Sequence, residues 1–227
     1  SLIASGAISF DQSGLTSDAG QQSIDWTYDP AAADLDWLAN GDSLTLTYTA
    51  QITDGAGNVG DQDLVITING TNDEPTIDSA TNPDAITEST DAEAQNIPAT
   101  TGTITFTDQD LGDSLTLSVD GDASASYTPS GGVAGDVPTA NTEVDISSLI
   151  ASGAISFDQS GLTSDGGQQT IDWTYDPAAA DLDWLQDGDT LTLTYTAQIT
   201  DGAGNVGAQD LVITINGTND VPTIDSA

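Results

Sequence analysis

The chain has 227 residues and 37 acidic side chains, and it contains no Lys, Arg, His, Cys or Met. The lack of cysteine excludes a disulfide-stapled scaffold, and the lack of both histidine and cysteine excludes the usual zinc, copper and iron sites. A nucleic-acid or anionic-membrane partner is disfavoured, because no basic side chain is present to neutralise a phosphate. The length predicts one or two domains.

The acidic residues are almost all aspartates. The only glutamates are Glu74, Glu88, Glu93 and Glu143. Aspartate favours turns and short loops, where its carboxylate lies close to backbone or to a cation. Because no basic side chain exists, repulsion between carboxylates must be relieved by water, salt, protonation or a bound metal. Calcium accepts six to eight oxygen ligands, so the composition predicts Ca²⁺ binding in loops. A charge that serves only solubility is the alternative.

The chain repeats itself at an offset of 147 residues, so that residues 1–80 align with residues 148–227 without a gap. Copies this similar are expected to do the same job, which fits a spacer better than a specialised site. The two copies differ at seven positions: Ala19/Gly166, Ser23/Thr170, Ala39/Gln186, Asn40/Asp187, Ser43/Thr190, Asp61/Ala208 and Glu74/Val221.

The repeat predicts the domain organisation. We expect residues 73–220 to form one complete repeat, residues 1–72 to be the C-terminal half of another, and residues 221–227 to begin a third. The half-repeat is expected to lack half of its core and to be a poor autonomous domain. Such an organisation indicates a longer array of repeats.

Strand signals run along the complete repeat. Residues 191–199 alternate apolar and polar side chains, which predicts a strand with one buried face and one face lined by threonine. The glycine-rich residues 201–205 then predict a hairpin turn. Many short strands separated by turns favour an all-β antiparallel sandwich. In chain order, strands are expected near residues 102–106, 115–119, 154–157, 170–175, 191–199 and 211–215.

A short helix is predicted between Asp176, which can cap it, and Gly188, which would stop it. Pro177 suits the first helical position, and Leu182 and Leu185 fall on one helical face.

Three aromatic side chains near this segment have two interpretations. Trp173, Tyr175 and Trp184 lie inside the strand and helix patterns, which favours packing in the core. A sugar-binding aromatic platform is the alternative.

Two segments carry a resemblance to a known family. Thr-Gly-Thr-Ile-Thr-Phe-Thr-Asp-Gln-Asp-Leu-Gly-Asp-Ser-Leu-Thr-Leu at 101–117 looks like the opening of the VCBS-type repeat of giant bacterial RTX adhesins. Leu-Thr-Leu-Thr-Tyr-Thr-Ala-Gln-Ile-Thr-Asp-Gly at 191–202, followed by Ile-Asn-Gly-Thr-Asn-Asp-Val-Pro at 215–222, resembles its ending. Trp-Thr-Tyr-Asp-Pro-Ala-Ala-Ala at 173–180 also fits. Residues 120–147 look like an insertion to which the resemblance assigns no role.

The resemblance implies an immunoglobulin-like or cadherin-like sandwich in the extender region of a secreted adhesin. Such a protein would be extracellular, anchored at the bacterial cell surface and exported by type I secretion. The glycine-rich nonapeptide of the calcium β-roll is absent from the sequence, so that module is not expected.

The resemblance also implies where calcium would bind. In a sandwich of this kind, the linker at 71–73, the loop at 108–113 and the hairpin tip at 201–205 should share one end, and Glu88 is expected to approach it. The arrangement is similar to cadherin linkers, in which an Asn-Asp pair and an Asp-x-Asp loop share calcium between domains. The candidate metal ligands are Asn72, Asp73, Glu88, Asp108, Asp110, Asp113, Asp201, Asn205, Asn219 and Asp220.

Each of these loops also has a plainer interpretation. Residues 108–113 have the composition of an ordinary solvated turn, and Asp201 and Asn205 belong to dipeptides that form turns without any metal.

The leading functional hypothesis is a calcium-rigidified extender whose partners are neighbouring repeats of the same chain. No specific ligand, nucleic acid or membrane insertion is expected. A module that binds carbohydrate or another surface is the alternative, since repeated copies would give avidity. An enzyme is disfavoured, because without His, Cys or Lys only paired carboxylates remain for acid–base chemistry.

Overall fold

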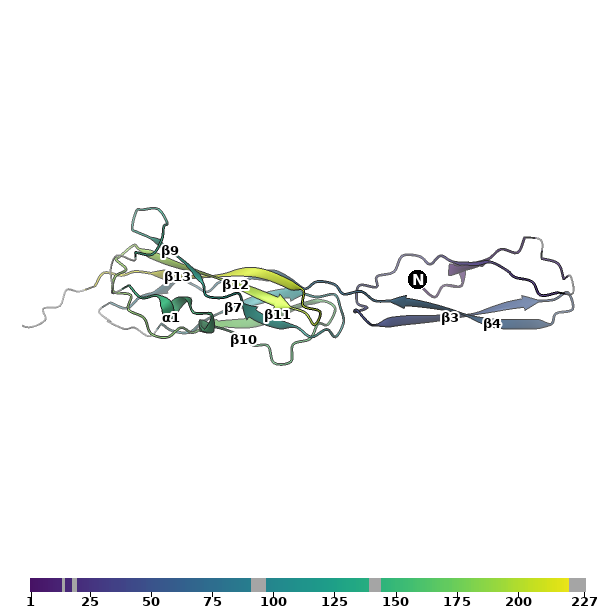
Figure 1. Cartoon of the computed structure of the whole chain (residues 1–227). Helices are drawn as coiled ribbons and strands as arrows, with labels where there is room; N and C mark the ends of the chain where they lie inside the picture. Colours follow the sequence, from purple (N-terminus) through teal and green to yellow (C-terminus); the bar gives the residue numbers. More distant parts are fainter. Residues whose placement is uncertain (14, 18–19, 91–96, 139–143, 221–227) are drawn as a thin grey trace, which may run out of the picture. The chain divides into compact units, whose positions relative to one another are not determined.

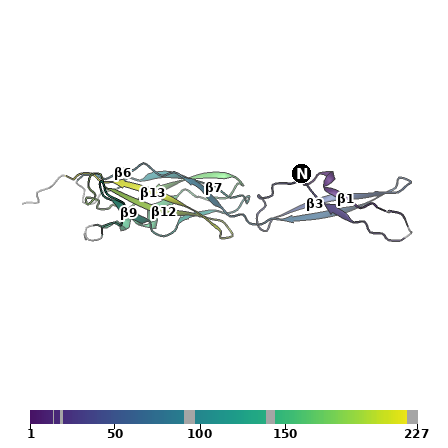
Figure 2. The same cartoon turned by 90° about the horizontal axis from the view of Figure 1, so that it is seen from above.

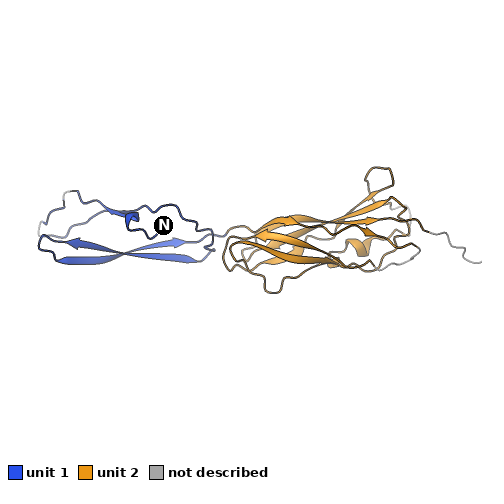
Figure 3. Ribbon diagram, turned by 180° about the vertical axis from the view of Figure 1, so that it is seen from behind, with its two compact units in different colours: residues 1–72 blue, residues 73–227 orange. Residues whose placement is uncertain are grey.

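The chain folds into two compact units, Ser1–Asn72 and Asp73–Ala227, which are coloured separately in Figure 3. The computed structural model describes residues 1–227 except 14, 18–19, 91–96, 139–143 and 221–227. The expected start of a third repeat at 221–227 therefore lies outside the described residues. Within the described part of the chain, no helix is long and apolar enough to cross a membrane.

Unit 2 is an immunoglobulin-like, antiparallel β-sandwich (Figure 1). One sheet has the strand order β10-β11-β7-β5, and the other has the order β6-β13-β12-β8 with β9 also on β12. The described strand pairs are antiparallel apart from β6, which runs parallel to β13. The strands are β5 Thr76–Ala80, β6 Ile86–Thr87, β7 Thr100–Thr107, β8 Thr116–Val119, β9 Ser124–Thr128, β10 Ile155–Phe157, β11 Gln168–Tyr175, β12 Thr190–Thr200 and β13 Val206–Asn216.

The core lies between the two sheets and follows the period-two pattern of the strands. Along β12 every second residue is buried, from Leu191 to Ile199, and the threonines between them face outward. Phe106 on β7 and Trp173 on β11 close the core from the opposite sheet, each with no exposed surface. The six strands predicted from the sequence are confirmed.

The aromatic side chains are confirmed as core residues rather than a binding platform. Trp173 and Tyr175 are fully buried, and Trp184 is half-buried with its ring 5.6 Å from that of Tyr127. The Tyr175 hydroxyl donates to the carbonyl of Leu149, whereas the indole nitrogens of Trp173 and Trp184 are buried without a hydrogen-bond partner.

The predicted helix after Asp176 is wrong, and the complete repeat has its short α-helix elsewhere. Leu185 N–H bonds to Leu182 O, which makes a single turn. Asp181 Oδ1 accepts from Asp183 N–H, so a side chain takes a backbone donor that a helix would have used. The helix of the unit is α1, Ser147–Ile150, followed by the 3₁₀ turn η2, Ser152–Ala154.

The insertion at 120–147 joins the sandwich through a buried carboxylate. Its strand β9 lies against β12 (Figure 2), and Tyr127 pairs again with Gly135 in the loop that follows. Asp189, at the start of β12, is 3% exposed. Its Oδ2 accepts from the Tyr127 hydroxyl at 2.6 Å, and its Oδ1 accepts from Ser130 N–H at 2.8 Å. Asp189 therefore fixes the insertion to the sheet.

Unit 1 repeats the second half of this sandwich. Its pairings β1–β2 and β3–β4 have the same register as β10–β11 and β12–β13, shifted by 147 residues. The elements are η1 Ser5–Ala7, β1 Ile8–Phe10, β2 Trp26–Tyr28, β3 Ser43–Thr53 and β4 Val59–Asn69.

Replacing the anchoring carboxylate should lower stability. Asp189→Asn puts an amide NH₂ among groups that donate hydrogen bonds, so we expect a loss of about 1–3 kcal/mol in the free energy of unfolding, measured by urea denaturation. Tyr127→Phe should cost much less in the Asp189→Asn background than in the wild type. Asp187→Asn is the control, because Asp187 is exposed. Equal losses for Asp187→Asn and Asp189→Asn would contradict the anchoring role.

Candidate metal-binding site

Five aspartates gather at one end of unit 2, where β7 ends and the β12–β13 hairpin turns. Asp73 N–H donates to Asp110 Oδ2 at 2.8 Å. A Cβ atom added to Gly202, next to Asp201, would lie 2.9 Å from Asp113 Oδ1, so the hairpin tip contacts the loop after β7. The proximal cluster consists of Asp73, Asp108, Asp110, Asp113 and Asp201, whose charges repel one another.

Three of these aspartates accept a backbone hydrogen bond with one carboxylate oxygen. The other oxygen has no hydrogen-bond partner, and we call it open. Asp108 Oδ1 accepts from Asp110 N–H at 3.0 Å, Asp110 Oδ2 accepts from Asp73 N–H, and Asp113 Oδ1 accepts from Ser114 N–H at 3.1 Å. The remaining oxygens, Asp108 Oδ2, Asp110 Oδ1 and Asp113 Oδ2, are buried without a hydrogen-bond partner. Asp108 and Asp110 have no exposed surface. A buried carboxylate oxygen without a partner is costly.

A serine that the sequence did not single out holds this loop in place. Ser164 is buried, and its hydroxyl donates to Asp108 O at 2.6 Å. Its backbone N–H donates to Asp113 O, and its carbonyl accepts from Gly112 N–H. The loop is therefore pinned from both sides by a residue more than fifty positions away, and no local pattern could have revealed it.

Asp201 and Asn205 hold the hairpin turn together. Asp201 Oδ1 accepts from Ala203 N–H and Asn205 N–H, and Asp201 Oδ2 accepts from Asn205 Nδ2 at 2.9 Å. These contacts support the interpretation that Asp201 and Asn205 form a turn that needs no metal. Asp201 still contributes negative charge to the proximal cluster.

The clustering changes the acidity of the buried carboxyls. Burial raises the pKa of Asp108 to about 6, and repulsion from Asp110, Asp113 and Asp201 adds to the rise. Burial likewise raises the pKa of Asp110, with Asp73 and Asp113 contributing. A cation bound beside these two carboxyls would lower their pKa values and favour the ionised form.

Glu88 does not lie in the proximal cluster, and the expectation that it approaches this end is wrong. Strand β6, just before it, pairs with the far end of β13 at Ile215 and Asn216. Glu88 Oε1 accepts from Thr218 N–H at 2.6 Å, and Glu88 Oε2 is buried without a hydrogen-bond partner. The position of Glu88 could not be predicted from the sequence, because β6 has only two residues and Thr218, which bonds to Glu88, is 130 positions away.

Glu88 belongs to a second group of carboxylates. Burial raises the pKa of Glu88, and repulsion from Asp220 and Asp183 contributes. We call Glu88, Asp183 and Asp220 the distal cluster. Asn219 is adjacent, and its Nδ2 donates to Asp220 O. Asn72 ends unit 1, and its role as a ligand stays a prediction.

The open oxygens fit a hard cation. Aspartate and glutamate oxygens are the ligands that calcium prefers, and its flexible coordination suits an irregular loop. Among the residues that the structure describes, no three acidic side chains already stand at metal-binding distances. Metal binding would therefore require these side chains to rotate. A carboxylate with an open oxygen can rotate at little cost, whereas Asp189, whose two oxygens both accept hydrogen bonds, cannot.

Comparison with known proteins gives no family. No family model matches the chain, and no curated protein matches it. Several solved structures are distantly similar, and two of them are named here. PapD-like domain 7 of human CEP192 has 9% identity and a TM-score of 0.32, covering 65% of this chain and 87% of its own. The CooA pilin subunit of enterotoxigenic Escherichia coli has 11% identity and a TM-score of 0.30, covering 64% and 99%. Similarity this low says nothing about function.

The raised pKa values predict an unusual pH dependence without metal. Asp108 has a pKa of about 6 in the folded state, against about 3.9 in the unfolded chain. As the pH falls from 7 to 5, the folded state therefore takes up a proton at Asp108 that the unfolded state does not. The free energy of unfolding of the chelator-treated protein should therefore rise by about 1 kcal/mol as the pH falls from 7 to 5. Urea denaturation at both pH values measures this. A flat or falling stability would contradict it, and Asp108→Asn should remove most of the rise.

Proposed function

We propose that this chain is part of a calcium-dependent extender, a structural spacer built from tandem sandwich repeats. The observation that carries the proposal is the set of buried, open oxygens of Asp108, Asp110 and Asp113 in a chain that has no basic side chain. Their burial would be stabilised if a cation took the place of the missing basic partner. Calcium fits their chemistry better than a metal that prefers nitrogen or sulfur.

The residues that would hold calcium in the proximal cluster are Asp108, Asp110 and Asp113, with Asp73 beside them. Bound calcium supplies positive charge and draws separate segments together; it performs no chemistry. Because Asp73 comes from the segment entering the sandwich and Asp110 from the loop after β7, their shared ion would stiffen that entry.

The two ends of the repeat explain why this proposal extends to an array. Asp73 lies in the proximal cluster, and Asp220, its equivalent one repeat later, lies in the distal cluster. In consecutive repeats the same aspartate would thus belong to the distal cluster of one sandwich and to the proximal cluster of the next. Calcium held there would join neighbouring repeats of the same chain and limit bending.

The shape of the repeat suits a spacer. Strands β12 and β13 each have 11 residues, which corresponds to about 36 Å of length per repeat. The aromatic residues of unit 2 are used in the core, so no observation favours a carbohydrate-binding module. An extracellular location on a bacterial surface, with type I secretion, is part of the proposal and rests on the resemblance of the repeat sequence to adhesin extenders.

Removing calcium should lower stability and loosen the chain. At a calcium concentration a thousandfold above Kd, one site adds about 4 kcal/mol, which raises Tm by on the order of 10 °C for a unit of this size. Thermal unfolding in 2 mM calcium, in EDTA and in 2 mM magnesium measures this, with X-ray scattering for solution dimensions. If EDTA changes neither Tm nor dimensions, the proposal fails.

Removing charge from the proximal cluster should act in opposite directions with and without calcium. Asp108→Asn relieves the cost of a buried charge, so the variant should be at least as stable as the wild type in EDTA. In calcium the same variant should lose most of the metal-induced rise in Tm, because a ligand is gone. Asp120→Asn is the control, since Asp120 is exposed and outside the cluster. A loss of stability for Asp108→Asn in EDTA equal to that in calcium would indicate a purely structural role.

A further inference from the structure

Three Asn-Gly dipeptides occur in the chain, at residues 40–41, 69–70 and 216–217. Asparagine loses its side-chain amide most readily in this dipeptide, because glycine has no side chain to hinder attack by its own backbone nitrogen. The reaction also needs that nitrogen to be free of a hydrogen bond, and it needs room for the backbone to turn. These two requirements separate the three dipeptides.

The dipeptide at 69–70 is held by the turn that precedes β3. Asn69 is the last residue of β4. Gly70 N–H donates to Asp42 O at 3.0 Å, so the nitrogen that would attack already has an acceptor. A Cβ atom added to Gly70 would lie 2.0 Å from Leu38 O, so this backbone is packed too tightly to turn.

The dipeptide at 216–217 is held in the same way at the end of β13. Gly217 N–H donates to Asp189 O at 3.0 Å, and a Cβ atom on Gly217 would lie 2.4 Å from Gln186 O. The backbone carbonyl of Asn216 accepts from Glu88 N–H at 3.0 Å. Attack at either of these two sites would therefore require the end of the strand to open first.

The dipeptide at 40–41 meets neither obstacle. Asn40 and Gly41 are the central residues of a β-turn, which is closed by Asp42 N–H donating to Ala39 O at 3.0 Å. Both central residues are exposed. Gly41 has a φ of 94°, the conformation that favours glycine at the third position of a β-turn. The hydrogen bond that closes the turn uses the nitrogen of Asp42 and not that of Gly41.

The second copy shows that the exposure of this turn is a property of the repeat. Asp187 and Gly188 occupy the same turn in unit 2, where Asp189 N–H donates to Gln186 O at 2.8 Å and Gly188 has a φ of 86°. Asp187 is exposed although the insertion lies beside this turn, with Ser130 Oγ 2.6 Å from a Cβ atom placed on Gly188. An aspartate at the position of Asn40 therefore fits the turn.

We propose that the fold directs a spontaneous modification to Asn40, in which its side-chain amide becomes a carboxylate. The Gly41 nitrogen bonds to Asn40 Cγ, the Cγ–Nδ2 bond breaks, and ammonia leaves with the proton that the Gly41 nitrogen loses. Water then opens the five-membered imide. Cleavage of the bond from nitrogen to Cγ gives aspartate. Cleavage of the bond from nitrogen to the backbone carbonyl carbon gives isoaspartate, whose main chain is one methylene longer.

The two products differ in what they do to the turn. Aspartate reproduces the residue at 187 and adds one negative charge. Isoaspartate lengthens the backbone between Ala39 and Asp42, whose carbonyls contact Gly70: Asp42 O accepts its N–H, and Ala39 O would lie 2.2 Å from its added Cβ atom. Gly70 directly precedes the linker at 71–73. Isoaspartate would therefore loosen the backbone where β4 leads into the linker.

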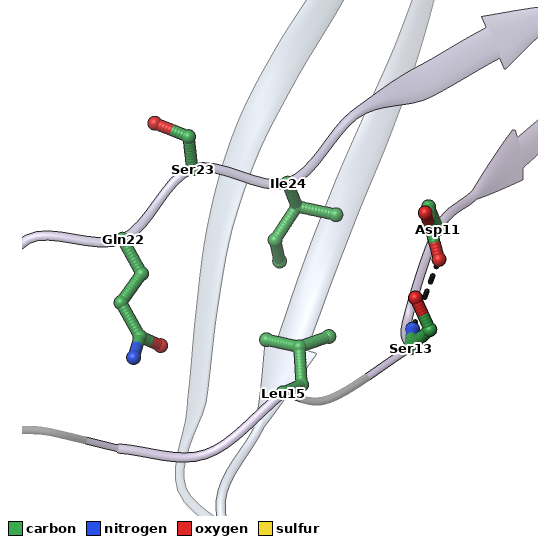
Figure 4. Close-up of a pocket in the computed structure, with 6 residues that line it drawn as sticks. All are labelled: Asp11, Ser13, Leu15, Gln22, Ser23 and Ile24. Carbon is green, nitrogen blue, oxygen red and sulfur yellow. Dashed lines mark hydrogen bonds between the residues drawn. The ribbon is translucent and has the colours of Figure 1, made fainter.

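Exposure of an amide is not sufficient to select the site. Gln22 has an exposed side-chain amide, which donates to Thr16 O. Attack by the next backbone nitrogen, that of Ser23, would have to close a six-membered ring beside a residue that has a side chain. Gln22 is therefore expected to keep its amide, which makes it an exposed reference within the same chain. It borders the hollow of Figure 4, which is lined by Asp11, Ser13, Leu15, Gln22, Ser23 and Ile24.

The test follows the three dipeptides in one sample of the 227-residue chain kept at pH 8. Chymotryptic peptides are mapped by mass spectrometry, since trypsin has no site in this chain. Conversion of an amide to a carboxylate adds about 1 Da. Asn40 should be converted about tenfold or more faster than Asn69 and Asn216, because only those two require the strand end to open. Equal rates at the three sites would overturn the proposal, and so would conversion of Gln22 before Asn40.

The unfolded chain is the control for flanking sequence. In concentrated urea the three dipeptides should be converted at similar rates, because nothing then holds Gly70 or Gly217. If Asn69 and Asn216 stayed slow in urea, the residues around them rather than the fold would protect them, and the proposal would be wrong.

Hydrogen exchange at Gly70 tests the effect of the modification on the turn. Asn40→Asp should leave this exchange unchanged, because the second copy has aspartate in the turn. The aged chain, which contains isoaspartate, should exchange Gly70 N–H about tenfold faster than the fresh chain. Asn40→Gln should keep the slow exchange over the same period, since its side chain is not converted. Identical exchange in the aged chain and in aged Asn40→Gln would contradict the loosening.

Discussion

The whole structure has to accommodate 37 carboxylates without a basic side chain. Most of the described ones face water, and the five buried ones fall into two groups that differ in what the second carboxylate oxygen does. Asp189 and Asp201 use both oxygens to accept hydrogen bonds, so they stabilise a turn or an insertion and need nothing more. Asp108, Asp110 and Glu88 keep one oxygen buried and open. The use of the second oxygen thus distinguishes structural carboxylates from candidate ligands better than acidity or exposure does.

Much of the fold could be predicted from the sequence because strands have a local period. The alternation along residues 191–199 fixes which face of β12 is buried, whatever packs against it. The segment after Asp176 has helical spacing but forms no helix, because the Asp181 and Asp189 carboxylates accept hydrogen bonds from its backbone N–H groups. Glu88 was misplaced because a two-residue strand carries almost no signal, and its partner Thr218 is fixed only by tertiary contact.

The two copies show which parts of the fold are local. The β3–β4 hairpin has the same 11-residue register as β12–β13, although one face of it is exposed. Its turn, held by Asp54 and Asn58 as by Asp201 and Asn205, is therefore determined within the hairpin. The first part of β11 is different, since the equivalent residues of unit 1 form no strand without β7. Local sequence determines the hairpin, and a distant segment determines the remaining edge.

The differences between the copies leave the candidate metal ligands unchanged. None of the seven substitutions falls on a candidate metal ligand, and the change nearest to one is Glu74/Val221, next to the paired positions Asp73 and Asp220. If the distal cluster of one repeat meets the proximal cluster of the next, every repeat must fit any neighbour, and near-identity satisfies that condition. Uniform copies would therefore preserve the acidic junctions proposed between repeats.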